Sequence, residues 1–232
     1  MTAAQRHQRQ FFRSVAIFSR LSDEALDEVM RGFHVRMFSR DAFLFVEGDE
    51  SVSFFIVAAG RVRLFKTSPR GREFTIAIRR ARQFFDLPPV FDGKPHPVSA
   101  GALTNLRLYV SSLPHIQEMM ARFPELHRAL DVHLAEMLRG MADVASDLAF
   151  TDVSTRLARL ILISARNDGR ETPDGVSLEW GLSQSEIAHL LGTAREVVSR
   201  NLRSLEKAGW VERTHSGILI RDWGALEKMA RQ

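Results

Sequence analysis

The feature that most restricts the fold is a pair of helix-start signals on either side of one glycine. Ser183-Gln-Ser-Glu186 and Thr193-Ala-Arg-Glu196 each place a hydroxyl three residues before a glutamate. In such a capping box, the hydroxyl accepts a backbone N–H and the glutamate reaches back to the capping residue. Gly192 stands between the two signals, where a left-handed residue would end the first helix. The spacing therefore predicts two helices joined by a tight turn.

The apolar residues of this segment predict which helix faces are buried. The inner faces consist of Ile187, Ala188, Leu191, Val198, Leu202 and Leu205. In the second helix the steps of four and three are typical of a helix with one buried stripe. Gly209 predicts the end of that helix. A short helix, a glycine turn and a longer second helix form the helix-turn-helix pattern.

The opposite face of the second helix carries polar chemistry. Arg195, Glu196, Ser199 and Arg200 lie at i, i+1, i+4 and i+5, so they share one face. They also occupy the first two turns, the part of a recognition helix that reaches base edges. Arginine can bond guanine O6 and N7, and glutamate can accept from cytosine N4. The alternative is a solvated face with an ion pair between Glu196 and Arg200. The turn and the capping boxes favour DNA.

A hairpin is predicted directly after the second helix. Residues 210–220 read as two strands around a His215-Ser-Gly turn, which makes a winged helix whose wing lies along DNA phosphates. Asp222 is predicted to cap a last short helix. The residues expected to contact DNA are Arg195, Glu196, Ser199, Arg200, Ser183, Thr193, Arg203, Arg213 and His215.

Residues from about 40 to 110 are rich in strand signals. Strand-like runs occur at 43–46, 53–57, 61–66 and 72–78, separated by glycine- and proline-containing turns. The run at 61–66 alternates basic and apolar residues, as expected of a strand with one wet face. Short strands at this spacing predict a sandwich or a barrel.

A long helix is predicted to connect the two regions, with Pro124 in its first turn. Its apolar residues are spaced by 4, 3, 4, 3 and 4: Leu130, Leu134, Met137, Met141, Val144 and Leu148. This heptad seam favours self-pairing in a dimer. The alternative is an amphipathic helix that lies on its own domain. Gly140 weakens the helix somewhat.

Composition excludes several classes of protein. The chain has no cysteine, which rules out disulfides, thiolate zinc sites and cysteine-held iron–sulfur clusters. No apolar run reaches the roughly 18–20 residues of a membrane span, and no signal-type segment opens the chain, so we expect a cytoplasmic protein. The net charge is only +4, so any charge that binds nucleic acid has to be placed locally.

The chain resembles the family of the cyclic-AMP receptor protein and the fumarate–nitrate reduction regulator, the CRP/FNR transcription factors. The strongest similarity lies in LSQSEIAHLLGTAREVVSRNLRSLEKAGWV, residues 182–211. Residues 17–22, 45–49, 54–60 and 148–157 resemble the family's opening segment, β-roll and hinge. The similarity covers nearly all of the chain.

The resemblance implies an α+β fold in three parts: an N-terminal β-roll over residues 1–123, similar to a cyclic-nucleotide-binding jelly roll; a dimerisation helix over 124–149; and a winged helix-turn-helix over 150–232. It implies a homodimer on double-stranded DNA, with half-sites about 34 Å apart, and a contact with RNA polymerase. The resemblance implies that the residues at the family's base-reading positions contact bases in a TGTGA-like inverted repeat. These residues are Arg195, Glu196 and Arg200. Ser199 resembles the branch that prefers TTGAT, which leaves the first bases open.

The chain departs from the nucleotide-binding members of the family. These carry a Gly-Glu pair and, about ten residues on, an Arg-Ser or Arg-Thr pair for the phosphate. Here Phe85 replaces the glycine, and no arginine stands near 96–98. His96 and Lys94 do not reproduce the two-pronged geometry of arginine. We therefore expect an effector other than cyclic AMP, or none. The candidate effector pocket is Phe85, Asp86, Leu87, His96 and Ser99.

Other effectors stay open at this stage, and no cofactor is assigned. Haem is one alternative, with His96, His115, His127 or His133 as iron ligands, although each is more often an ordinary histidine. The phenylalanines could line a pocket for a small apolar effector but are more often plain core. The run from Arg79 to Arg82 could bind an anion, although a solvated turn is the commoner use of such a run.

Two other classes of function compete with a transcription regulator. A cupin-type enzyme would also contain a β-barrel, but it needs clustered histidine and glutamate ligands, and the β-rich region contains only His96. A scaffold that regulates a protein partner would not need base-reading chemistry on the second helix. We therefore expect neither an enzyme nor a metal protein.

Overall fold

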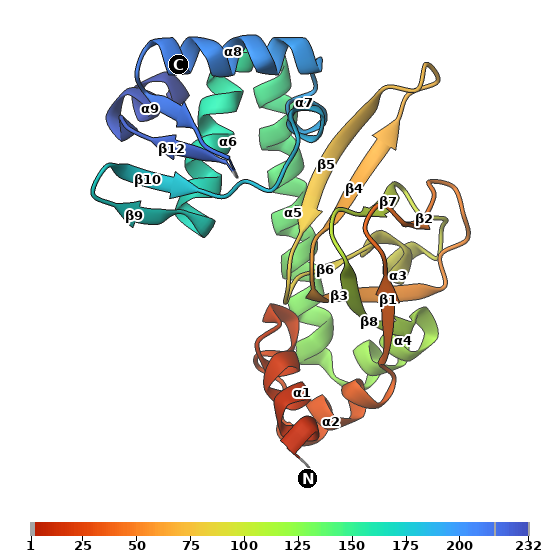
Figure 1. The fold of residues 1–232 in the computed structure, drawn as a ribbon. Coiled ribbons are helices and arrows are strands. Elements are labelled where there is room, and N and C mark those ends of the chain that lie inside the picture. The colour runs from red at the N-terminus through yellow and green to blue at the C-terminus, as the bar shows by residue number, and fades with distance from the viewer. Residues whose placement is uncertain (1–2, 216, 232) are drawn as a thin grey trace. The chain divides into compact units, whose positions relative to one another are not determined.

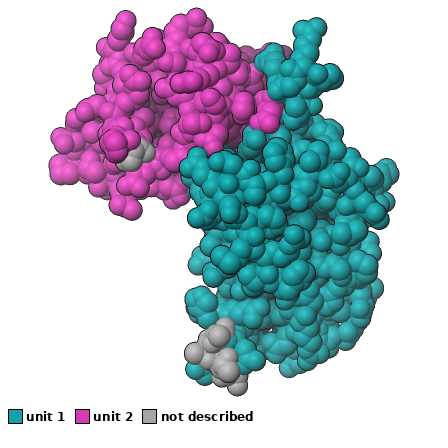
Figure 2. Space-filling view, turned by 45° about the vertical axis from the view of Figure 1, so that its right-hand side comes forward, with its two compact units in different colours: residues 1–72, 76–140 teal, residues 73–75, 141–232 magenta. Residues whose placement is uncertain are grey.

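The structure is a computed structural model, which describes residues 3–215 and 217–231. The chain forms two compact units (Figure 2). The first comprises residues 1–72 and 76–140, and the second comprises residues 73–75 and 141–232. Each unit has a hydrophobic core of its own.

The N-terminal unit begins with helices that the sequence analysis did not predict. These are α1 (Ala3–Arg13), a single 3₁₀ turn (Ala16–Phe18) and α2 (Asp23–Arg31). Ser22 caps α2, because its hydroxyl accepts the backbone N–H of Ala25 at 3.1 Å. Arg13 ties the segment together by donating to the carbonyl of Phe18 and to Asp23.

Eight strands form two four-stranded antiparallel sheets, which confirms the predicted β-roll (Figure 1). One sheet has the order β1-β8-β3-β6, with strands His34–Phe38, Leu106–Ser112, Ser53–Ala59 and Phe84–Phe85. The other has the order β2-β7-β4-β5, with strands Phe43–Phe45, Ser99–Ala102, Val62–Thr67 and Glu73–Arg79. Four of these strands lie where the sequence predicted them.

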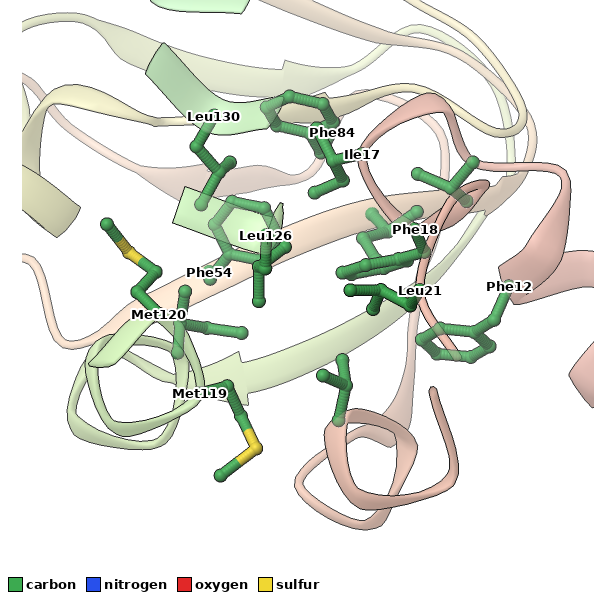
Figure 3. Packing of buried hydrophobic residues seen from close by; sticks show 14 of the residues in the cluster. Phe12, Ile17, Phe18, Leu21, Phe54, Phe84, Met119, Met120, Leu126 and Leu130 are labelled. Atoms are coloured by element: carbon green, nitrogen blue, oxygen red, sulfur yellow. The ribbon is translucent and has the colours of Figure 1, made fainter. Parts of the chain in front are cut away.

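The first unit has two apolar clusters. One fills the space within the β-roll and includes Phe45, Phe55 and Phe85. The other lies among β3, β6 and the helices, including α4 (Leu113–Arg122) and the start of the long helix. Figure 3 shows Leu126 and Leu130 in this second cluster, together with Phe54 and Phe84. A short helix, α3 (Pro88–Asp92), follows β6.

The predicted long helix is one continuous element, α5 (Pro124–Phe150). Gly140 lies inside it without a break, and nothing stands within 4 Å of the place where a Cβ would be at this residue. Leu126 and Leu130 are its fully buried residues. The N-terminal part of α5 is thus part of the core of the first unit.

The second unit is a helical domain with a small sheet. Its elements are α6 (Val153–Asp168), β9 (Arg170–Thr172), β10 (Gly175–Leu178), α7 (Gln184–Leu191), α8 (Arg195–Lys207), β11 (Val211–Arg213), β12 (Ile218–Ile220) and α9 (Trp223–Ala230). β11 and β12 form the predicted hairpin after α8, which confirms the winged helix. The hairpin is extended by β10 and β9 into a four-stranded sheet, which the sequence analysis did not predict.

Aspartate side chains cap the first and last helices of this unit, and Asp222 is the cap that the sequence predicted. Asp152 accepts the N–H of Thr155 at the start of α6, and Asp222 accepts that of Ala225 at the start of α9. In the part of the chain that the structure describes, no helix is both long and apolar enough to span a bilayer.

Candidate nucleic-acid interface

The first helix of the pair begins and ends as predicted. Ser183 accepts the N–H of Glu186 at 3.2 Å, and the Glu186 carboxylate accepts the N–H of Ser183 at 2.6 Å, so the capping box is complete. Gly192 ends α7 with φ of 64°, a left-handed conformation that costs a residue with a Cβ about 1–2 kcal/mol. The turn geometry of a helix-turn-helix is therefore present.

The second capping box is not formed, so this prediction was wrong. α8 begins at Arg195, its N-cap is Ala194, and no side chain caps it. The reason lies in the preceding turn, where the N–H of Thr193 donates to the carbonyl of Ala188 at 2.9 Å. This bond belongs to the end of α7 and keeps Thr193 in the turn. The recognition-type helix consequently starts one residue later than the box implied.

The two faces of α8 have opposite character. Val198, Leu202 and Leu205 are buried in the core of the second unit, as predicted. On the other face Arg195, Glu196 and Arg200 are exposed, and Ser199 is half-buried. With α8 starting at Arg195, all four side chains lie in its first two turns.

The charged residues of this face are not paired with one another. Among the residues that the structure describes, the side chains of Arg195, Glu196 and Arg200 form no ion pair and no hydrogen bond. The i,i+4 pair between Glu196 and Arg200, which the solvated-face alternative requires, is absent from this part of the chain. Two guanidinium groups and a carboxylate thus remain available to an external partner.

The other candidate DNA-binding residues differ in their surroundings. His215 and Arg203 are exposed. Arg213 is exposed as well, but its Nε donates to the carboxylate of Glu206 at 2.7 Å. Glu206 is not among the residues that the sequence predicted for the site. The hydroxyl of Ser183 accepts the capping bond, so only its own proton remains for a phosphate.

Two arginines of α6 hold the frame of the second unit and were also missed. Arg156 donates to the carbonyls of Asp147 and Thr151 at the end of α5, and to the carbonyl of Leu191 at the end of α7. It thereby adds a donor to carbonyls at two helix C-termini, where a cation is also favoured by the helix dipole. Arg159 adds an ion pair with Asp147. The signal for these contacts is tertiary, since Leu191 lies 35 residues from Arg156, and Ala230, whose carbonyl accepts the Arg159 Nε, lies 71 residues from Arg159.

The predicted seam of α5 divides into two parts. Leu130 is completely buried in the core of the first unit (Figure 3). Leu134 is half-buried and packs against the same core. Met141, Val144 and Leu148 are 46%, 39% and 41% exposed. Leu138, which lies beside the seam, is 70% exposed. An apolar strip therefore remains uncovered on the second half of the helix.

The five residues of the candidate effector pocket are all buried. His96 Nδ1 lies 2.6 Å from Asp86 Oδ2, and the hydroxyl of Ser51 donates to the same oxygen at 3.0 Å. Burial raises the pKa of Asp86, while His96 and Ser51 act in the opposite direction. The other carboxylate oxygen, Oδ1, is buried and has no hydrogen-bond partner among the described residues.

Aromatic rings enclose this acid–base pair. The ring of His96 is stacked on Phe45 with centroids 3.7 Å apart and an angle of 8° between the planes. Phe85 stacks on Phe55, with centroids 5.1 Å apart. Leu87 belongs to the second core cluster, and the hydroxyl of Ser99 accepts the N–H of Glu47 at 3.0 Å. The structure thus packs His96 and Phe85 as core side chains.

The other histidines are spread over separate contacts. His115 Nε2 lies 3.1 Å from the carbonyl of Val29, and its ring fills the space where Gly32 would carry a Cβ. His127 and His133 face carboxylates on their own helix, Asp131 and Glu136, at 3.8 and 3.5 Å. Within the described chain, no group of three or more potential metal ligands comes together.

Comparisons with known proteins support both halves of this architecture. Residues 35–123 match the model of the cyclic nucleotide-binding domain, and residues 155–229 match the model of the Crp-like helix-turn-helix domain. Together the two models account for the β-roll and for the α7–α8 pair with its wing.

Related proteins align over nearly the whole chain. The sequence is 29% identical over 215 residues to the CRP-like cAMP-activated global transcriptional regulator of Mycobacterium tuberculosis. This alignment covers 93% of this chain and 96% of the relative. It is 26% identical over 215 residues to the global nitrogen regulator of Synechocystis, with coverages of 92% and 93%. The solved structure of a CooA mutant from Carboxydothermus hydrogenoformans has a TM-score of 0.76 and 28% identity, over 91% of this chain and 98% of that one.

A cyclic-nucleotide-binding-type β-roll, a long helix and a winged helix-turn-helix with an unpaired polar face together define a DNA-binding transcription regulator. The chain belongs to the CRP/FNR family of transcription regulators. This is a family of regulators rather than of enzymes, and its helix-turn-helix implies binding to DNA.

Proposed function

We propose that this protein is a homodimeric regulator that reads a TGTGA-like inverted repeat through Arg195, Glu196 and Arg200. The observation that carries the proposal is the absence of ion pairs on this face within the described chain, together with the burial of Val198 and Leu202 behind it. Charged side chains that neither pair nor pack are the groups a recognition helix presents to base edges.

Each side chain has a defined chemical role in this proposal. Arg195 and Arg200 donate in a bidentate way to guanine O6 and N7, and Glu196 accepts from cytosine N4. The half-buried Ser199 contacts a base or a phosphate. The remaining polar candidates contact DNA phosphates, where they add affinity without sequence information. These are Arg203, Arg213, His215, Thr193 and Ser183.

Dimerisation is assigned to the exposed half of the α5 seam. Met141, Val144 and Leu148 follow steps of 3 and 4 and leave an uncovered apolar strip, as a coiled-coil partner requires. The half-sites then lie about one DNA turn, or about 34 Å, apart. Leu130 and Leu134 act instead as the anchor of α5 in its own core.

We propose that the protein responds to an effector other than cyclic AMP, or that it needs no effector. The relative from M. tuberculosis is named as cAMP-activated, but in this chain His96 forms a buried pair with Asp86 and stacks on Phe45. No arginine lies at 96–98 to bind a cyclic phosphate. Haem is not favoured, because His96 and His115 already make internal contacts. A small apolar or anionic effector stays compatible with the β-roll.

The protein is proposed to act in the cytoplasm, with RNA polymerase as its protein partner, as the family resemblance implies. A cupin-type enzyme is not proposed, because no three of the described histidines and carboxylates come together as a metal site would require. A scaffold that does not bind DNA is not proposed either, because such a protein would not need three unpaired charged side chains on the exposed face of α8.

The test is a salt-dependent binding assay with the duplex TGTGA-N6-TCACA and a scrambled duplex of the same composition. We expect the specific duplex to bind at least about a hundredfold more tightly at physiological salt. Arg195→Ala should remove most of this preference, whereas Arg20→Ala, which removes an exposed arginine from the first unit, should not. Equal affinity of the unmodified protein for both duplexes would refute the proposed readout. Adding cyclic AMP should leave the preference unchanged.

A further inference from the structure

A carboxylate at the end of α8 holds the arginine at the base of the wing. Glu206 Oε1 accepts the Arg213 Nε at 2.7 Å and the Arg213 backbone N–H at 3.3 Å. Arg213 is the last residue of β11, and the wing turn that follows is closed by a bond from the Thr214 N–H to the Gly217 carbonyl. One carboxylate thus links the recognition-type helix to the strand that enters the wing.

The position of Glu206 in α8 is unfavourable by itself. It lies in the last turn, where the helix dipole and the unpaired carbonyls disfavour a negative charge. The hydrogen bond from Arg213 lowers the pKa of Glu206, and the same bond raises the pKa of Arg213. Both groups are therefore charged at neutral pH. Arg203 is a second cation nearby, but the hydrogen bonds of Glu206 go to Arg213.

The bond to Glu206 leaves most of the Arg213 guanidinium unused. Arginine has five N–H donors in a planar fork, and the bond through Nε occupies one of them. No other side-chain hydrogen bond of Arg213 is found between the described residues. The four donors on the two terminal nitrogens are the ones that grip a phosphate in a bidentate way.

We propose that Glu206 is a positioning residue, which holds Arg213 by Nε so that the terminal nitrogens are presented to a DNA phosphate. The inference rests on the proposed function, because it assumes that the wing lies on DNA. A free arginine side chain loses rotamer entropy when it binds, and a side chain that is already held loses less. Glu206 would thus raise affinity although its own charge is repelled by DNA.

These two effects of Glu206 are separated by a double-mutant cycle. The proteins are the unmodified chain, Glu206→Ala, Arg213→Ala and the double variant, measured on TGTGA-N6-TCACA and on the scrambled duplex over a range of salt. The electrostatic repulsion acts whether or not Arg213 is present, so it cancels from the coupling. We expect Glu206→Ala to be about fivefold more harmful when Arg213 is present, on both duplexes, because a phosphate contact carries no sequence information.

A matched control uses a carboxylate on the same strand. Glu212 pairs with Arg221 at 2.7 Å, whereas the hydrogen bonds of Arg213 go to Glu206. Glu212→Ala also removes one negative charge from the wing, so it should combine additively with Arg213→Ala. Additivity of Glu206→Ala with Arg213→Ala, like that of the control, would overturn the inference. So would an Arg213→Ala protein that binds both duplexes like the unmodified chain.

Replacement by lysine gives a readout that a purely structural role would not move. A lysine ammonium is a point charge and cannot hold Glu206 through one nitrogen and a phosphate through others. Arg213→Lys should therefore bind DNA about as weakly as Arg213→Ala, and Glu206→Gln should restore much of the affinity of the lysine variant. Full affinity of Arg213→Lys alone would contradict the positioning role.

The inference and the proposed function fail in different ways. If the unmodified protein does not distinguish the two duplexes, the proposed base readout is wrong. If Arg195→Ala removes the preference while the Glu206–Arg213 cycle is additive, only the positioning role is wrong. Thermal unfolding and circular dichroism of each variant identify the variants that do not fold. If an alanine variant does not fold, the lysine and glutamine variants still test the inference.

Discussion

His96 Nδ1 and Asp86 Oδ2 lie 2.6 Å apart, both side chains are buried, and the His96 ring is stacked on Phe45. Asp86 also adopts a left-handed backbone, with φ of 63°, which is uncommon for a residue other than glycine. A buried carboxylate in such a position depends on its partners, here His96 and Ser51.

Removing the partner of Asp86 should destabilise the first unit in a pH-dependent way. Burial raises the folded-state pKa of Asp86, so its ionisation costs folding free energy as pH rises above about 4. His96 limits this cost, and His96→Leu should raise the pKa of Asp86 further. We expect a loss of about 3 kcal/mol at pH 8 and a smaller loss at pH 4, measured by urea unfolding.

The double variant Asp86→Ala, His96→Leu is the control for this experiment. It has no buried carboxylate, so its stability relative to the unmodified chain should not fall further between pH 4 and pH 8 from this source. An equal loss for His96→Leu at both pH values would show that the ring acts by packing on Phe45 and not by pairing with Asp86.

A second prediction concerns base reading by Arg200. Arg200→Ala should weaken binding to the TGTGA duplex by about 1–3 kcal/mol and relax the preference at one G·C pair. Binding to scrambled DNA should change much less, because a base contact contributes little there. The measurement is fluorescence anisotropy with duplexes changed one base pair at a time. A uniform loss on all duplexes would instead assign Arg200 to a phosphate.

The two halves of the α5 seam should respond differently to substitution. Met141→Glu puts a charge into the exposed strip and should dissociate the proposed dimer while the fold remains. Leu130→Ala should cost about 2–5 kcal/mol of folding free energy, because the side chain is fully buried, and should leave dimer affinity unchanged in the folded fraction. Sedimentation equilibrium and thermal unfolding separate these effects. A Met141→Glu protein that remains dimeric would place the interface elsewhere.

Two glycines offer opposite predictions for one kind of substitution. Gly192→Ala forces a Cβ into a left-handed conformation at the end of α7, and we expect it to destabilise the second unit by about 1–2 kcal/mol. Gly140→Ala lies within α5 with open space around it, and should stabilise that helix by about 1 kcal/mol. Thermal unfolding of both variants is the measurement. A neutral Gly192→Ala would show that the turn tolerates another conformation.

The sequence was most informative where a local rule determines the structure. The complete capping box at Ser183, the turn at Gly192 and the buried stripe of α8 depend on residues within a few positions of each other. The second capping box does not form, because the N–H of Thr193 donates to the carbonyl of Ala188 and keeps Thr193 at the end of α7. The heptad spacing of α5 was real, but spacing alone does not tell whether Leu130 faces a partner or its own core.

The residue pattern predicted a sandwich or barrel, a long helix and a winged helix-turn-helix in succession, together with the face of α8 that carries Arg195, Glu196 and Arg200, and the family resemblance specified the β-roll. Periodicity and capping depend on residues that are close in the sequence, so they can be recognised from the sequence itself. Only the tertiary structure decided that Glu206 holds Arg213, that Asp86 pairs with His96, and which part of α5 is left uncovered. These contacts depend on how side chains from separate elements pack and pair, and no local pattern in the chain encodes which elements meet.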